Sequence, residues 1–92
     1  MTNTEIIDRV RENLAANKPQ EALTLLNSHF SGDEIEILFL KGEIYYKLQK
    51  WGDSLNHFNL FLEYFPKDKK AQAYCVMIHN ILGFHHKDLL NP

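Results

Sequence analysis

Residues 38–66 read LFLKGEIYYKLQKWGDSLNHFNLFLEYFP, and this stretch decides the fold. Apolar residues recur at helical spacing on both sides of a short connection, so the stretch predicts two helices packed back to back. Leu55, Phe58 and Leu62 lie three and four residues apart, which places them on one face of the second helix. Because Pro66 disfavours helix at the residue before it, we expect the second helix to end there.

A glycine inside the first of these helices needs a packing reason, because glycine costs about 1 kcal/mol relative to alanine in a helix interior. Gly42 has no side chain, so a second helix can approach its backbone closely. We expect the small Ser54 to face it. Tyr45 and Leu48 are then expected to fill the seam together with the apolar face of the second helix.

The order of large, small and aromatic residues in this stretch resembles one tetratricopeptide repeat (TPR). In that family a large apolar residue precedes a glycine by four, and a tyrosine follows the glycine by three. A small residue, an aromatic residue and a proline complete the motif. The matching residues here are Leu38, Gly42, Tyr45, Ser54, Phe58 and Pro66. The resemblance implies a helix-turn-helix repeat, but the family shares an architecture and not a chemistry.

The residues before this stretch predict a second helical pair. Thr2 and Glu5 have the spacing of a capping box, so a first helix should begin near residue 3. Pro19 suits the first turn of a following helix, where no N–H is needed. The apolar residues at helical spacing in this pair are Ile6, Ile7, Val10, Leu14, Ala22, Leu23, Leu26 and Phe30.

This first pair looks like a degenerate copy of the later one. Ala22 and Leu26 precede Ser54 and Phe58 by the same 32 residues. No glycine or tyrosine occupies the matching places in the first helix, so this repeat depends on register and on the helix-turn-helix pattern.

Two connections carry turn signals. Gly32 suits a left-handed exit from the preceding helix. Asp33 and Glu36 repeat the capping-box spacing, so we expect the third helix to begin at Asp33. Residues 51–53 are expected to connect the third and fourth helices, with Trp51 wedged between them.

A fifth helix, capped by Asp68, is apolar over more than half of its circumference. One face carries Ala71, Tyr74, Cys75, Ile78 and Leu82, and a second carries Ala73, Met77, Ile81 and Phe84. The last helix of a repeat array should be polar outside, so something must cover the second face. Its cover is either the tail, through Leu89 and Leu90, or another protein molecule.

The sequence therefore predicts an all-α fold: a right-handed antiparallel array of TPR-like helix-turn-helix units. The chain of 92 residues allows one small domain. Its expected parts are a degenerate repeat (3–34), a second repeat (35–66), a closing helix (67–84) and a tail (85–92).

Composition narrows the class of protein. The net charge is −2 and no basic stripe occurs, which argues against a nucleic-acid partner. No apolar run reaches the roughly 18 residues of a membrane helix, and the N-terminus does not resemble a signal peptide. Cys75 is the only cysteine, which excludes a disulfide within the chain and favours a reducing, cytoplasmic location. Its apolar neighbours predict a buried, inert thiol.

No motif for catalysis or for a cofactor is present. The chain has five histidines, but a metal site needs three or four converging ligands. His79 and His86, with Asp88 nearby, are the closest approach to such a set. The four glycines are isolated, so no phosphate-binding loop is indicated. We therefore expect no metal, no cofactor and no enzymatic activity.

In the TPR family the first helix of each pair lines a concave groove that binds a peptide or partner segment. The resemblance therefore implies a non-catalytic interaction module, an adaptor or scaffold whose partner is another protein. By register, the groove residues are Ile7, Arg11, Leu14, Glu36, Phe39, Glu43, Tyr46, Lys47, Lys70, Met77 and Ile81, with Thr4 and Ala73 beside them. Some members clamp a C-terminal carboxylate with paired Asn and Lys, but this chain has acids and aromatics there. For Phe39 and Tyr46, an equally weighted alternative to a role in binding is that they help to form the core or are simply exposed to water.

A second hypothesis is a self-associating structural protein. Its apolar fifth helix would pair with its copy about a two-fold axis.

Overall fold

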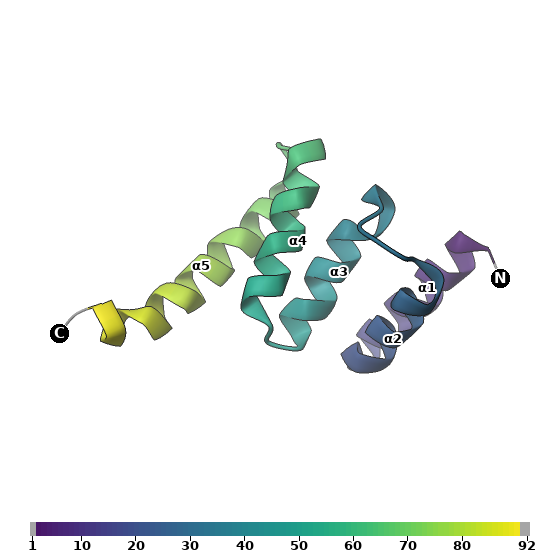
Figure 1. Ribbon diagram of the computed structural model, residues 1–92, viewed down its shortest axis with the longest axis horizontal. Coiled ribbons are helices and arrows are strands. Elements are labelled where there is room, and N and C mark those ends of the chain that lie inside the picture. Colours follow the sequence, from purple (N-terminus) through teal and green to yellow (C-terminus); the bar gives the residue numbers. More distant parts are fainter. Residues whose placement is uncertain (1, 91–92) are drawn as a thin grey trace.

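The computed structural model describes the backbone of residues 2–90 and the side chains of residues 2–83, and all of the regular structure there is helical. The helices are α1 (Asn3–Ala15), α2 (Pro19–His29), α3 (Ile35–Lys47), α4 (Trp51–Tyr64) and α5 (Lys69–Leu90). Each packs against the next along the chain (Figure 1). The molecule measures 53 × 27 × 21 Å, because the helices are added side by side instead of around one centre. The all-α prediction is confirmed.

Several predicted helix ends are confirmed. At the start of α1 the Glu5 N–H donates to Thr2 Oγ1 (3.2 Å), and the Thr2 N–H donates to Glu5 Oε1 (3.4 Å). Pro19 is in the first turn of α2. α4 ends two residues before Pro66, and Asp68 Oδ1 accepts from the Ala71 N–H at 2.9 Å at the start of α5.

Other predicted ends are wrong. Gly32 does not have a positive φ, because α2 ends in extended backbone at Phe30. Glu34, not Asp33, is the N-cap of α3, and no side chain caps that helix. Asp33 instead accepts from Lys41 and lies beside His57, so its carboxylate is used elsewhere.

The connection between α3 and α4 and the end of α5 also differ from prediction. Residues 48–50 form the connection, and Trp51 already begins α4. Its half-buried ring lies edge-on to Tyr46, with centroids 5.2 Å apart, so Trp51 contacts α3 from the first residue of α4. α5 continues to Leu90, so residues 85–90, predicted as tail, are helical. The side chains of Phe84, Leu89 and Leu90, with which that prediction was concerned, lie outside the described residues.

The first two helices and the next two have matching geometry 32 residues apart. α1 covers residues 3–15 and α3 covers residues 35–47. The only non-glycine residues with positive φ in the described part are Asn17 (59°) and Gln49 (60°), one after each of these helices. Both exits are closed by an N–H two residues after the C-cap, Lys18 to Asn13 O (2.8 Å) and Lys50 to Tyr45 O (2.9 Å). This is the left-handed Schellman end of a helix, formed without glycine.

The core consists of two clusters that share α3. The first joins α1, α2 and α3, and its buried residues are Ile6, Val10, Ala22, Leu23, Leu26, Phe30, Ile37, Leu40 and Ile44. The second joins α4 and α5 around Phe58, Ala71, Cys75 and Ile78, with half-buried aromatic residues of α3 packed on it. α3 is therefore covered on opposite sides and is the central helix of the molecule.

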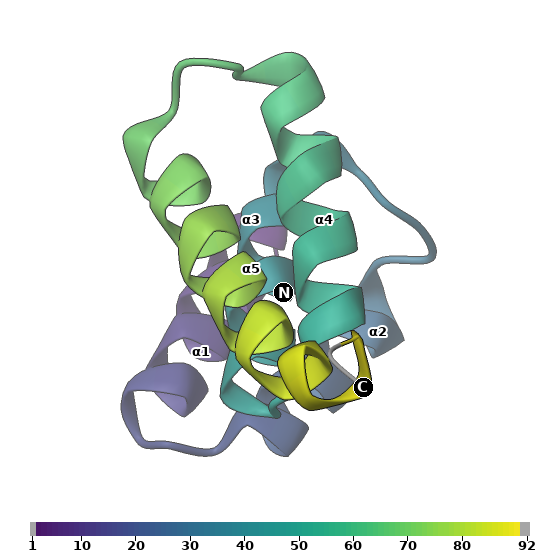
Figure 2. The same cartoon turned by 90° about the vertical axis from the view of Figure 1, so that its left-hand side faces the viewer.

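The predicted contact at Gly42 is present. Ser54 Oγ donates to the Gly42 carbonyl at 2.7 Å, and both residues are buried. Phe58 is fully buried, and its ring lies against the Gly42 backbone. Figure 2 shows how the helices are layered: α2 and α4 lie on one side of the molecule, and α1 and α5 lie on the other.

Candidate interaction groove

Three adjoining hollows cross α3 between α1 and α5, and together they are called the groove below. The first, of about 510 Å³, is lined by Leu14, Ala15, Glu43, Tyr46, Lys47, Gln49, Trp51 and Tyr74. The middle one, of about 390 Å³, is lined by Arg11, Leu14, Phe39, Glu43 and Lys70. The third, of about 490 Å³, is lined by Arg11, Ile35, Glu36, Phe39, Phe61, Phe65, Asp68 and Lys70. Neighbouring hollows share residues, so they form one continuous surface.

Aromatic rings form the floor of the groove and brace one another. Tyr46 lies edge-on to both Trp51 and Tyr74, with centroids 5.2 and 5.1 Å apart. Phe39 lies edge-on to Tyr74 at 6.0 Å, and Phe58 stacks on Tyr74 at 4.5 Å from below. Such offset and edge-on pairs are favourable by about 0.5–1.5 kcal/mol beyond burial. The floor is therefore an interlocked set of side chains from α3, α4 and α5.

A single carboxylate lies in the middle of this floor. Glu43 is half-buried, and the Tyr74 hydroxyl donates to its Oε2 at 3.3 Å. Burial raises the pKa of Glu43, while the Tyr74 hydrogen bond and the positive charges of Arg11, Lys70 and Lys47 act in the opposite direction. Burial, together with the Glu43 charge, raises the pKa of Tyr74. A carboxylate in such a position is a polar contact point within an apolar surface.

The structure brings together most, but not all, of the residues predicted for the groove. Those that line it are Arg11, Leu14, Glu36, Phe39, Glu43, Tyr46, Lys47 and Lys70. Ile7 is half-buried against the first core cluster. Met77 (41% exposed) and the half-buried Ile81 line none of the three hollows. Thr4 and Ala73 are exposed and line none of them either.

Sequence reasoning missed several lining residues for identifiable reasons. Tyr74 was assigned to the buried face of the fifth helix, and its ring does pack on Phe58 while its hydroxyl reaches Glu43. Trp51 was assigned to a connection between helices. Phe61 and Phe65 belong to α4 and its exit, whereas the register of a TPR-like array points only to the first helix of each pair. The pair Phe61 and Phe65, four residues apart, was the available signal.

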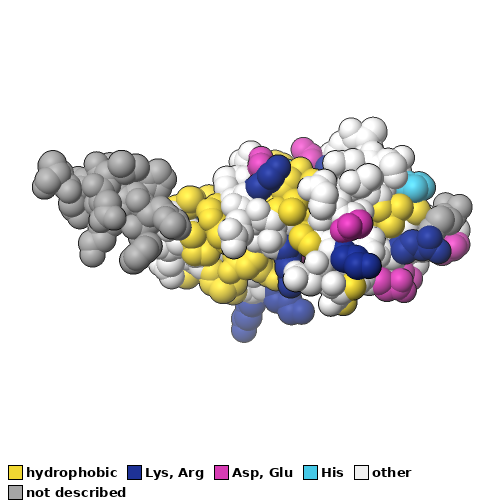
Figure 3. All heavy atoms as spheres, turned by 90° about the horizontal axis from the view of Figure 1, so that it is seen from below, with side chains coloured by type: hydrophobic (Ala, Val, Ile, Leu, Met, Phe, Trp, Pro, Cys, Tyr) yellow, Lys and Arg dark blue, Asp and Glu magenta, His cyan; other side chains and the backbone are white. Residues whose placement is uncertain are grey.

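An exposed apolar patch lies on α5 outside the groove. Val76 is 59% exposed and Met77 is 41% exposed. Figure 3 shows hydrophobic side chains gathered next to the part of the chain drawn in grey. Of the second face predicted from the sequence, Ala73 and Met77 are exposed and Ile81 is half-buried, whereas Val76 belongs to neither predicted face.

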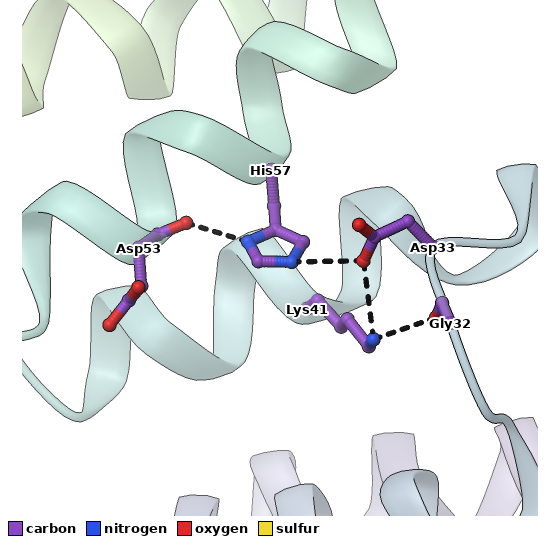
Figure 4. A network of polar contacts seen from close by, with 5 residues as sticks. All are labelled: Gly32, Asp33, Lys41, Asp53 and His57. Carbon is purple, nitrogen blue, oxygen red and sulfur yellow. Dashed lines mark hydrogen bonds and ion pairs between the residues drawn. The ribbon is translucent and has the colours of Figure 1, made fainter.

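A polar network fixes the connection between α2 and α3 (Figure 4). Lys41 is 7% exposed, and its Nζ donates to the Gly32 carbonyl (2.8 Å) and to Asp33 Oδ1 (3.4 Å). His57 Nε2 lies 3.3 Å from the same Asp33 oxygen, and its Nδ1 lies 2.7 Å from the Asp53 carbonyl oxygen. A buried ammonium group needs such hydrogen-bond acceptors. Through Lys41 of α3 and His57 of α4, both helices contact the connection between α2 and α3.

The remaining chemistry of the described residues is sparse. They include no group of three or more His, Cys, Asp and Glu side chains placed to hold a metal ion. Cys75 is buried, and burial raises the pKa of its thiol, which disfavours the reactive thiolate. None of the helices, over the residues described, combines the length and apolar character needed to cross a membrane.

Comparison with protein-family models found no matching family, and comparisons with curated proteins and with solved structures found no match. The class defined by the molecule itself is an all-helical domain with an aromatic groove across its central helix.

Proposed function

We propose that this chain is a TPR-like array that acts as a non-catalytic interaction module, binding a segment of a partner protein in the groove. The observation that carries the proposal is that α1, α3 and α5, the first helices of the proposed units, all contribute residues to three adjoining hollows. A surface with a rigid aromatic floor and a charged rim suits a peptide segment.

The repeat part of the proposal is supported by the 32-residue offset. Val10 and Gly42 are both buried at matching places, and so are Leu26 and Phe58. The left-handed residues Asn17 and Gln49 obey the same offset. An array built of such units places their first helices on one side, which is how a groove arises. The groove favours a role as an adaptor or scaffold. The single cysteine favours a location in the cytoplasm.

The test is binding mapped residue by residue. Displayed random peptides are selected against the chain, and the enriched peptides are titrated into isotope-labelled protein. We expect shifts at Phe39, Tyr46 and Tyr74, and at least tenfold weaker binding by Tyr46→Ala. The matched control is His29→Ala, because His29 is an exposed aromatic side chain on α2 that lines none of the hollows. Shifts confined to other surfaces, or no enriched peptide, would contradict the proposal.

The exposed Val76 and Met77 favour a second candidate, self-association through α5. Sedimentation across a dilution series decides between a monomer and a dimer. If α5 is an interface, Val76→Glu with Met77→Glu should give a monomer and leave the groove unaffected. A monomer at every concentration removes this candidate.

A further inference from the structure

The groove as a whole is lined by three cations and three carboxylates, but its middle hollow has two cations and one carboxylate. Arg11 from α1, Lys47 from α3 and Lys70 from α5 are exposed and line it. No ion pair within 4.0 Å involves any of them among the described residues, where the only pairs are those of Asp33. The one carboxylate among the three cations is Glu43, which is half-buried and already accepts from Tyr74.

The other two carboxylates lie in the third hollow, away from Lys47. Asp68 is occupied as the cap of α5, where it accepts from the Ala71 N–H. Glu36 is exposed in the first turn of α3. The first and middle hollows are therefore lined by three cations and one half-buried carboxylate, in a chain whose net charge is −2. The positive excess is confined to these two hollows, because Glu36 and Asp68 balance Arg11 and Lys70 in the third.

Arg11 and Lys70 have a particular relation to the aromatic floor. They line the same two hollows from opposite flanking helices, and Phe39 of the central helix lies in both hollows with them. A carboxylate placed over Phe39 would lie in the two hollows that both cations line, while a neighbouring apolar side chain would contact the rings beyond. Opposite charges arranged in this way steer association and set specificity.

We infer that the groove binds an acidic peptide segment that also carries large apolar side chains, with one carboxylate held between Arg11 and Lys70 above Phe39. The inference rests on the proposed function of the groove. Single-stranded nucleic acid is also anionic and stacks on aromatic rings. It fits less well, because a phosphate backbone places negative charges all along the groove, where Glu36, Glu43 and Asp68 would repel them. A peptide can place one carboxylate at Arg11 and Lys70 and apolar side chains elsewhere.

Two displayed peptide libraries test the inference. Both fix leucine and phenylalanine at the same helical spacing; one allows Asp, Glu, Ser and Gln at the other positions, and the second allows Lys, Arg, Ser and Gln. We expect binders from the acidic library, with affinity that falls as salt is raised. Arg11→Glu combined with Lys70→Glu should weaken them by at least about tenfold, as expected for loss of close charge pairs.

The matched control combines Lys18→Glu with Lys69→Glu, which makes the same change of net charge at two exposed lysines outside the groove. This variant should bind as the unchanged chain does. Circular dichroism of both double variants verifies that each remains folded.

Each other outcome has a definite meaning. Groove binders from the basic library alone, or acidic binders unaffected by the Arg11 and Lys70 reversal, would overturn the inference and leave the proposed function standing. Tight binding of a labelled single-stranded oligonucleotide in the groove would also overturn it. Failure of both libraries and of random peptides would overturn the proposed function itself.

Discussion

The backbone of Gly42 lies so close to Phe58 that a Cβ atom at position 42 would be 2.7, 2.8 and 2.9 Å from three carbons of the ring. Real Cβ atoms do not approach other heavy atoms this closely, so α3 or the ring would have to move. The ring cannot move freely, because it also stacks on Tyr74 and is fully buried. The contact therefore fixes the distance between α3 and α4.

Gly42→Ala should destabilise the protein although alanine is the better helix former. Overpacking costs about 1–3 kcal/mol, and the gain in helix propensity returns about 1 kcal/mol. Urea unfolding monitored by circular dichroism measures the difference. Gly52→Ala is the control, since nothing lies within 4 Å of a Cβ built there. A Gly42→Ala protein as stable as the original would contradict this account of the packing.

The sequence was sufficient to predict this contact and the helical class. Gly42 and Ser54 are small enough to let two helices approach closely, and Phe58 lies on the apolar face of the second helix. It was not sufficient at Asp33, whose spacing to Glu36 is that of a capping box. In the folded chain Asp33 is reached by Lys41 and His57 from α3 and α4, and these tertiary partners outweigh the local capping preference. No local pattern contains that information.

The groove was predictable to the extent that it follows helix register. Eight of its lining residues were anticipated because consecutive first helices repeat the same face. Met77 and Ile81 were placed by the same rule and lie away from the hollows. The rule assumes that successive helices pack at the same angle. α5 is 22 residues long and packs mainly on α4, so its later residues do not line the hollows across α3.

Gln49→Gly should stabilise the protein by about 0.5–1 kcal/mol, because glycine adopts a left-handed φ without the steric cost of a side chain. Asn17→Gly should gain less, since asparagine tolerates this conformation better than glutamine. Thermal or urea unfolding of the two variants provides the comparison. Loss of stability in the Gln49 variant would show that the side chain itself stabilises the exit from α3.

Lys41→Met should cost about 1–3 kcal/mol, because it keeps the aliphatic chain but leaves the Gly32 carbonyl without its donor and Asp33 with His57 alone. The control is Lys47→Met in the same helix, where the side chain is exposed and the change should stay within about 0.5 kcal/mol. Equal stability of the two variants would mean that the network contributes nothing net.

Glu43→Gln tests the partly buried carboxyl through pH. Burial raises the pKa of Glu43 above 4.5, so the favourable neutral form is fully present below pH 4.5, and its contribution to stability is lost as pH rises through the folded-state pKa. The variant should therefore become the more stable protein towards neutral pH, by less than about 1 kcal/mol because water screens the half-exposed group. Unfolding curves across this range measure the difference, and a difference that does not change with pH would contradict the prediction.

The grip of Lys41 and His57 on Asp33 has a consequence for recognition. The connection between the first helical pair and the second is restrained by side chains of two helices, α3 and α4. Under the proposed function, a restrained connection would lose less conformational entropy when a partner segment binds, which would favour affinity for a given contact area. The same restraint would favour segments whose side chains fit the existing hollows over bulkier ones.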